Sequence, residues 1–270
     1  MNVTGAVVVV TGGASGIGAA LCRRFAADGA RAVIVVDRTA DATAALAAEI
    51  GGVAEVVDVT DAQAVADLVE RVERDHGAID LFCANAGILT GIGIEDDPDD
   101  LWHRAFEVNV MAHVYAARAI VPRMIERGGG YLVTTASAAG LLTAPGDAPY
   151  SVSKHGAVAL AEWLSVTYGD RGLKVSVVCP LGVATPMLLD PLADGEFGAQ
   201  AVAASGRVVS ADEVADAVVA GIADERFLIL PHPEVSTFWA QKASDPGRWL
   251  AGVRRLLSNT GAGRSNEREA

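Results

Sequence analysis

Short runs of β-branched and apolar residues recur along the chain, separated by longer segments with helical periodicity. The runs occupy residues 6–10, 32–36, 53–57, 79–84, 131–136, 174–179 and 227–230. A run that is apolar at every position suits a strand covered on both faces, as in a parallel sheet. Alternation of such strands with helices predicts an α/β protein with a doubly wound sheet and helices on both faces.

The 270 residues are enough for one large core, and the 51% hydrophobic content excludes disorder for most of the chain. There is no internal repeat or linker, which predicts one domain over residues 1–258. Residues 259–270 are polar and contain glycine, so we expect a flexible tail. Residues 181–207 have no clear period, and we predict a functional or mobile excursion there.

Charge and cysteine usage exclude several classes of function. A formal net charge of −13 would repel nucleic acid and an anionic membrane. The first apolar run is too short to span a bilayer or to act as a leader, so we expect a cytoplasmic protein. Cys22, Cys83 and Cys179 are odd in number and lie in apolar segments, which predicts buried thiols rather than disulfides.

No metal site is predicted. The acidic run "EDDPDD" (95–100) is interpreted as a helix start, with Asp97 as the cap and Pro98 in the first turn. His103 and His113 are ten residues apart and lack a set of carboxylate partners.

The segment "TGGASGIG" (11–18) joins the first predicted strand to a helix, the context in which glycines bind a dinucleotide. Gly12 suits the tight turn, Gly16 allows close approach of a pyrophosphate, and Gly18 allows close helix packing. The helix N-terminus favours the anion. The spacing differs from the commoner G-x-G-x-x-G, so a plain glycine-rich turn is the alternative.

The second predicted strand ends at Asp37, nineteen residues after Gly18. A carboxylate there can accept both ribose hydroxyls and repels a 2′-phosphate, which favours NAD over NADP. Arg38 works against this preference, because its guanidinium would attract that phosphate. Asp58 is a candidate acceptor for the adenine amino group, whereas Asp61 is better placed to cap the next helix.

A tyrosine and a lysine follow the fifth predicted strand. Tyr150 and Lys154 share one face of a predicted helix, and Ser137 ends the strand. The free phenol has a pKa of about 10, and lowering it to about 7 requires about 4 kcal/mol. The Lys154 ammonium and an oxidised nicotinamide together are expected to supply it, so that Tyr150 exchanges a proton with a hydroxyl or carbonyl. Ser137 could bond the same oxygen. The alternative is that Tyr150 and Lys154 are ordinary solvent-exposed residues on a helix surface.

Two asparagines complete the candidate site. Asn85 follows the fourth predicted strand, at the edge where ligands bind such sheets, with a simple turn residue as the alternative. Asn109 lies in a segment of helical spacing, where an amide is disfavoured, so we expect its side chain to have a task. The alternative is a surface asparagine.

Taken together, "TGGASGIG", Asp58, "NAG" (85–87), Asn109, Ser137 and "YSVSK" (150–154) resemble the short-chain dehydrogenase/reductase family over about residues 5–230. The resemblance implies a single Rossmann-type domain with seven parallel strands. It also implies that Asn109, Ser137, Tyr150 and Lys154 are catalytic. In that scheme a proton passes from Tyr150 by way of Lys154 to a water near Asn109, and the nicotinamide exchanges a hydride with the substrate carbon.

The resemblance extends to "PLGVATPM" (180–187), which would hold the nicotinamide. Leu181 stands where the family has glycine, so we expect a reshaped turn. The predicted cofactor-binding residues are Gly12, Ser15, Gly16, Ile17, Gly18, Asp37, Arg38, Asp58, Val59, Asn85, Ala86, Gly87, Tyr150, Lys154, Pro180, Val183 and Thr185.

Apolar residues gather where a substrate would bind, and they predict a hydrophobic pocket with a mobile lid for an apolar or cyclic secondary alcohol. They are Ile88, Leu89, Leu141, Leu142, Met187, Leu188, Leu189, Leu192 and Phe197. Ordinary loop packing or an oligomer contact is the alternative. Gly156, Ala157 and Ala161 permit close helix approach, and the resemblance implies a homo-oligomer, a tetramer or dimer, formed through this helix and the one that holds Asn109.

The combined expectation is an NAD-dependent alcohol dehydrogenase or ketone reductase. Two alternatives stay open. The same site could serve an epimerase or dehydratase that recycles bound NAD, or the chain could be a dinucleotide-sensing protein without turnover.

Overall fold

The structure is a computed structural model that describes residues 1–94 and 99–259. Within these residues, seven parallel strands form one sheet in the order β3-β2-β1-β4-β5-β6-β9. The strands are β1 (Val7–Thr11), β2 (Ala32–Asp37), β3 (Val53–Val56), β4 (Leu81–Ala84), β5 (Gly130–Thr135), β6 (Leu173–Val178) and β9 (Leu228–Ile229). The chain winds outward from β1 in both directions, which confirms the doubly wound prediction.

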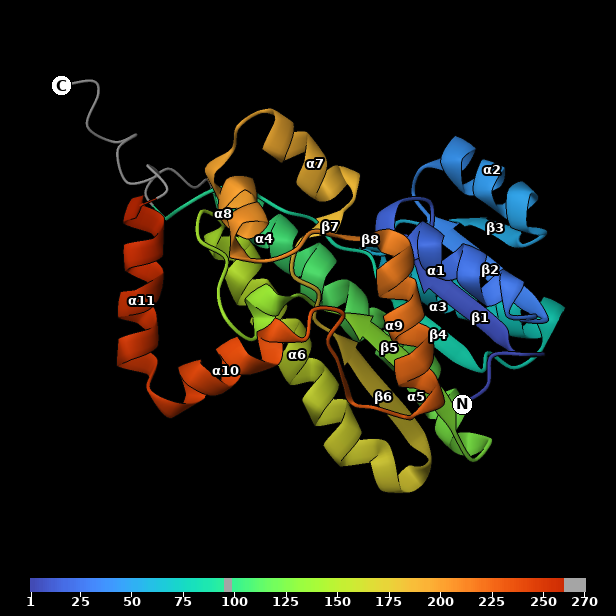
Figure 1. Ribbon diagram of the computed structural model, residues 1–270. Helices are drawn as coiled ribbons and strands as arrows, with labels where there is room; N and C mark the ends of the chain where they lie inside the picture. Colours follow the sequence, from blue (N-terminus) through green and yellow to red (C-terminus); the bar gives the residue numbers. More distant parts are fainter. Residues whose placement is uncertain (95–98, 260–270) are drawn as a thin grey trace.

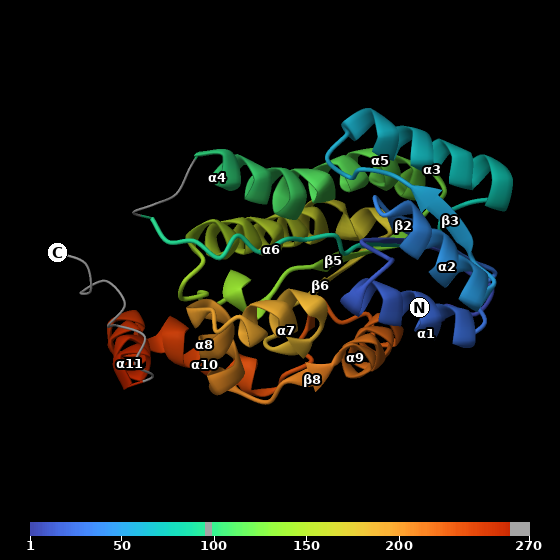
Figure 2. The same ribbon diagram turned by 90° about the horizontal axis from the view of Figure 1, so that it is seen from above.

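Helices cover both faces of this sheet, and Figure 2 shows the resulting three layers. They are α1 (Gly16–Ala27), α2 (Ala40–Ile50), α3 (Ala62–His76), α4 (Asp99–Phe106), α5 (Ala112–Glu126), α6 (Ala148–Tyr168), α7 (Pro186–Ala193), α8 (Phe197–Ser205), α9 (Ala211–Ala223), α10 (Glu234–Ser244) and α11 (Pro246–Asn259). Strand β1 shows why both faces are apolar. Val7 and Val9 pack with α3, α5 and α6, whereas Val8 and Val10 pack with α1 and α9.

Several local predictions can be compared with this structure. The Asp61 carboxylate caps α3 by accepting the Gln63 and Ala64 N–H groups at 2.9 and 3.0 Å, which confirms the predicted cap. All three cysteines are buried and free, as predicted. The predicted cap at Asp97 and the helix start at Pro98 lie outside the described residues, as does the predicted tail from residue 260 onward.

The segment 181–207 is more regular than the sequence indicates. Two short helices, α7 and α8, account for most of it, and β7 (Val183–Ala184) pairs with β8 (Val209–Ser210). Pro186 occupies the first turn of α7, where a proline needs no hydrogen-bond partner. Helices this short carry too few turns to show a period in the sequence. Figure 1 shows α7 and α8 side by side at one end of the sheet.

The small residues of α6 pack within the chain. Ala157 and Ala161 are fully buried in the core, and a Cβ added to Gly156 would lie 3.3 Å from Val110. These residues therefore explain the close packing of α6 on the rest of the chain, and the exposed face of α6 carries other side chains.

No helix in the described ranges combines the length and the apolar character that crossing a membrane requires.

Candidate active site

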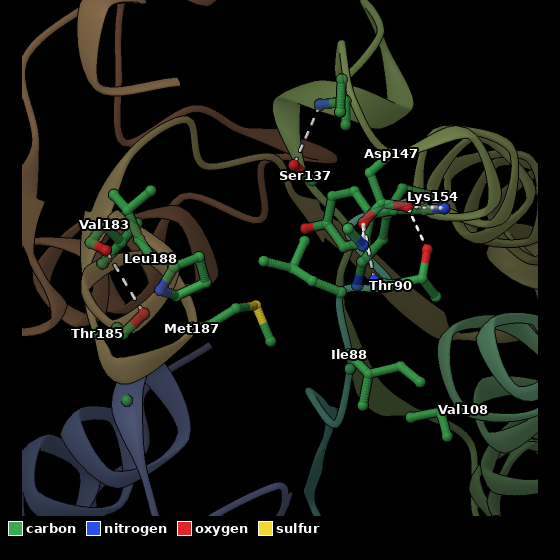
Figure 3. A pocket seen from close by; sticks show the side chains of 18 of the residues that line it. Ile88, Thr90, Val108, Ser137, Asp147, Lys154, Val183, Thr185, Met187 and Leu188 are labelled. Atoms are coloured by element: carbon green, nitrogen blue, oxygen red, sulfur yellow. Dashed lines mark hydrogen bonds between the residues drawn. The ribbon is translucent and has the colours of Figure 1, made fainter. Parts of the chain in front are cut away.

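A cavity of about 930 Å³ opens at the carboxyl ends of the parallel strands, where β1 and β4 lie side by side. Strand order reverses at this point, which is where open α/β sheets bind ligands. Every predicted site residue lines this cavity except Gly18 and Asn109. In Figure 3, Val183 and Thr185 lie on one side of it, and Thr90, Asp147 and Lys154 lie on the other.

The glycine turn between β1 and α1 fits a bound pyrophosphate. Gly12 has a φ of +62°, and a Cβ there would lie 2.9 Å from the Cα of Ala86. A Cβ on Gly18 would overlap the Gly12 carbonyl. Ser15 occupies the N-cap of α1 but makes no side-chain capping bond, so the N–H groups of the first turn stay available for an anion. These observations support a nucleotide cradle rather than a plain turn.

Two carboxylates line the cavity beside the ends of β2 and β3. Asp37 accepts the Ala14 and Thr39 N–H groups at 3.3 and 3.1 Å, which fixes its carboxylate at the tip of β2. Asp58 accepts the N–H and the hydroxyl of Thr60, and these bonds hold the pKa of Asp58 below its usual range. The Asp58 side chain is thus ionised and ordered by its own loop.

Arg104 of α4 also lines the cavity, and it contributes with Arg38 to the low pKa of Asp58. No sequence signal points to Arg104, because nothing in a helical segment marks which cation faces the sheet edge.

Asn85 ties the end of β4 to the glycine turn. Its amide nitrogen donates to the Thr11 carbonyl at 3.1 Å and to that of Gly12 at 3.4 Å. The Thr11 hydroxyl in turn accepts the N–H groups of Asn85 and Ala86 at 3.0 and 3.2 Å. This side chain is more than a turn residue, since it sets the distance between the two loops that face the cavity.

Burial decides the protonation of the Tyr150–Lys154 pair. The Lys154 ammonium lies 5.6 Å from the centroid of the Tyr150 ring and donates to the Thr135 carbonyl at 3.0 Å. Burial away from water raises the pKa of Tyr150 to about 12, although the hydrogen bond with Ser137 lowers that pKa in part. Burial also lowers the pKa of Lys154 to about 8. The predicted lowering of the phenol pKa needs the charge of a bound nicotinamide as well as that of Lys154, so it stays a prediction for the complex with cofactor.

Ser137 lies at the N-cap of the 3₁₀ turn η2 (Ala138–Gly140), where its hydroxyl accepts the Ala139 N–H at 3.1 Å. It is buried and faces the same cavity as Tyr150. This arrangement brings Ser137, Tyr150 and Lys154 to one cavity, as the sequence predicts.

Asn109 is held in a π-helical turn, η1 (Glu107–Met111), between α4 and α5. It is fully buried, so the surface alternative is wrong. Its amide nitrogen donates to the Ile88 carbonyl and to the Ser153 hydroxyl, both at 3.0 Å, and its oxygen accepts the Ile88 N–H at 2.8 Å. The side chain connects the loop after β4 to α6 and does not line the cavity.

A histidine holds the turn at Leu181. The Leu181 N–H donates to Nδ1 of His232 at 3.1 Å, which places the ring proton on Nε2. That nitrogen donates to the carbonyls of Gly182 and Arg207, both at 3.1 Å. A buried histidine thus supplies the contacts that fix the backbone next to Pro180.

The remaining wall is apolar, and Figure 3 shows Met187 extending toward the side that carries Ile88. Leu89, Leu188 and Phe197 also line it. Four residues predicted for this pocket lie elsewhere: Leu141 and Leu142 are buried in the core, and Leu189 and Leu192 turn away from the cavity. In the described part of the chain, no group of three or more His, Cys, Asp or Glu side chains is arranged to hold a metal ion.

Comparison with known proteins agrees with this geometry. Residues 6–194 match the family model described as short chain dehydrogenase. The chain is 38% identical over 258 residues to a 1-deoxy-11-beta-hydroxypentalenate dehydrogenase of Streptomyces avermitilis, covering 93% of each protein. It is 33% identical to the (-)-isopiperitenol/(-)-carveol dehydrogenase of Mentha piperita, covering 86% of this chain and 91% of that protein.

Among solved structures, a short chain dehydrogenase/reductase from Burkholderia phymatum in complex with NAD superposes with a TM-score of 0.83 at 27% identity. The match covers 91% of this chain and 95% of that one.

Proposed function

Because this chain belongs to the short-chain dehydrogenase family, we propose that it oxidises a secondary alcohol to a ketone, or catalyses the reverse reduction, with NAD as its cofactor. The observation that carries this proposal is the single cavity shared by the glycine turn, Asp37, Ser137, Tyr150 and Lys154. A sensor of dinucleotides would not need the last three residues.

Tyr150 is the proposed proton acceptor for the alcohol. With a pKa of about 12 in the chain alone, the phenol is protonated and a poor base at neutral pH. A bound oxidised nicotinamide supplies the hydride acceptor and a positive charge. Lys154 uses one N–H on the Thr135 carbonyl, which leaves two donors for groups in the cavity. Ser137 is placed to bond the substrate oxygen while Tyr150 takes its proton.

Asp37 supports NAD as the cofactor. Its fixed carboxylate at the end of β2 suits two ribose hydroxyls and repels a 2′-phosphate. Arg38 and Arg104 line the same end and would attract such a phosphate, so the preference depends on Asp37. The Burkholderia phymatum structure, which holds NAD, agrees with this assignment.

An apolar or cyclic secondary alcohol is the proposed substrate. The wall formed by Ile88, Leu89, Met187, Leu188 and Phe197 offers few groups that could bond additional hydroxyls. Two relatives are named as dehydrogenases of 1-deoxy-11-beta-hydroxypentalenate and of isopiperitenol or carveol, which fits such a wall.

We also propose that the chain forms a homo-oligomer through α6. Val152, Trp163 and Val166 are exposed on this helix, and Val166 is 87% exposed. Apolar side chains gathered on one helix commonly mark a contact between subunits.

The test is a panel of cyclic secondary alcohols and linear polyols, each assayed with NAD and with NADP for formation of the reduced cofactor. The proposal predicts net NADH formation with cyclic alcohols and the larger kcat/KM with NAD. Turnover of polyols alone would overturn the substrate class. Product formation without net NADH would favour the epimerase or dehydratase alternative.

A further inference from the structure

Asp147 is a buried carboxylate at the start of the helix that carries Tyr150. It is 6% exposed and occupies the N-cap of α6. One oxygen accepts the Tyr150 N–H at 3.0 Å and the Thr90 hydroxyl at 2.5 Å. The other accepts the N–H groups of Thr90 and Gly91, both at 2.8 Å. Figure 3 shows Thr90 and Asp147 side by side at the cavity.

These four bonds leave Asp147 no free position for a substrate. Each oxygen already accepts two donors, which is the capacity of a carboxylate oxygen. None of the ion pairs found among the described residues involves Asp147. A buried charge is stable without a counter-ion when hydrogen bonds satisfy it, so the four donors account for its presence.

Three of the four donors lie on the loop after β4, which forms one wall of the cavity, and the fourth is the Tyr150 N–H of α6. Asn109 holds this loop at Ile88, Asp147 holds it at Thr90 and Gly91, and the Ala148 N–H donates to the Ile92 carbonyl at 3.0 Å. All of these contacts except those of Asn109 come from the first turn of α6. The shape of the wall is therefore coupled to the position of Tyr150.

We propose that Asp147 is a positioning residue for the dehydrogenase reaction, which fastens the loop Thr90–Ile92 to the first turn of α6 and places a fixed negative charge beside Tyr150. This inference rests on the proposed function, because it concerns the same site. Asp147 is not among the site residues predicted from the sequence. The signal was present in "DAPY", where Asp147 precedes Pro149 in a helix-capping pattern.

The charge has a defined effect on the phenol. Asp147 and the Cys179 thiol both raise the pKa of Tyr150, and the Lys154 ammonium lies 5.6 Å from the centroid of its ring. Removal of the Asp147 charge should therefore lower that pKa, and the acid limb of the kcat/KM profile should move to lower pH.

Asp147→Asn tests both roles. An amide has one acceptor oxygen where the carboxylate has two, so one side of this four-bond set loses its acceptor. The link between the loop and α6 should therefore loosen, and KM for the alcohol should rise about tenfold. KM for NAD should stay within about twofold, and the acid limb should move down by about half a pH unit. Thr90→Val separates the roles, because it removes one donor and keeps the charge. It should raise KM for the alcohol and leave the pH profile unchanged.

Asp61→Asn is the matched control, since it makes the same change at the exposed N-cap of α3. It should leave KM and the pH profile unchanged. A wild-type KM and pH profile in Asp147→Asn would overturn the proposal. So would a uniform loss of kcat and stability with an unmoved acid limb, because that result assigns Asp147 a structural role only.

Amide hydrogen exchange gives a readout that needs no turnover. The proposal predicts at least tenfold faster exchange in Asp147→Asn at the Thr90 and Gly91 amides or at the Tyr150 amide, whichever side the new amide nitrogen faces, with exchange in the core strands unchanged. Unchanged exchange at these amides would contradict the clamp. If the wild type oxidises no alcohol in the panel while this exchange difference is found, the proposed function fails and the clamp stands.

Discussion

Tyr150 and Lys154 both move toward their neutral forms in the free chain. Burial raises the pKa of the phenol to about 12 and lowers that of the ammonium to about 8. The spacing of the two residues on α6 follows from the sequence, but the direction of the phenol shift does not. That direction depends on how far Tyr150 is buried. Its burial depends on the loop after β4, η2 and α7, which come together only in the folded chain.

Lys154→Met tests the cation at the residue scale. The rate at neutral pH should fall about 10²-fold or more, because the phenolate loses its nearest positive charge. The acid limb of kcat/KM should move to higher pH, opposite to the shift expected for Asp147→Asn. A pH series of initial rates measures both quantities. Lys174→Met is the control, since Lys174 is half-exposed and paired with Glu225 on the surface. An acid limb that stays in place in Lys154→Met would contradict this role of the ammonium.

Asp37→Asn tests the choice of cofactor. KM for NAD should rise about tenfold, since a charge-assisted bond to the ribose is weakened, and the preference for NAD over NADP should shrink. Kinetics with the two cofactors at equal ionic strength measure the change. Asp41→Asn, on the exposed first turn of α2, should have no such effect. An undiminished NAD preference in Asp37→Asn would mean that another group rejects the 2′-phosphate.

At the scale of elements, the sequence predicts strands and glycine turns better than it predicts short helices. The apolar runs reflect burial of a strand on both faces, which is a local requirement. The glycines of "TGGASGIG" reflect the room that a close backbone approach needs, which is also local. Helices α7 and α8 carry weak periodicity, and the contacts of Asn109 and Asp147 join segments that are distant in sequence. The anchoring of the loop after β4 therefore could not be predicted without the fold.

Gly18→Ala tests the packing of the glycine turn. The added methyl group would overlap the Gly12 carbonyl and approach the Asn85 amide at 2.7 Å. We expect a loss of about 1–3 kcal/mol in the free energy of unfolding and weaker NADH binding. Denaturant unfolding and NADH fluorescence measure the two effects. Gly169→Ala is the control, because a Cβ there meets nothing within 4 Å. Unchanged NADH binding in Gly18→Ala would argue against the cradle.

At the scale of the whole molecule, the predicted site lies at the carboxyl ends of the strands, and the exposed face of α6 is available for contact with a second copy. We expect sedimentation velocity to show a dimer or tetramer. Trp163→Glu, on the exposed face of α6, should shift the protein toward the monomer by burying an unpaired charge at the contact. Leu250→Glu on α11 should not. A wild type that sediments as a monomer at working concentration would contradict the interface.

The central claim is that Tyr150 exchanges a proton with the alcohol beside a bound nicotinamide. The most direct measurement compares NADH formation by the wild type and by Tyr150→Phe, with NAD and a cyclic secondary alcohol, alongside NADH binding to both proteins. The account predicts a loss of about 10²-fold or more in kcat, with binding changed by less than about twofold. A phenylalanine variant that turns over at the wild-type rate would contradict it.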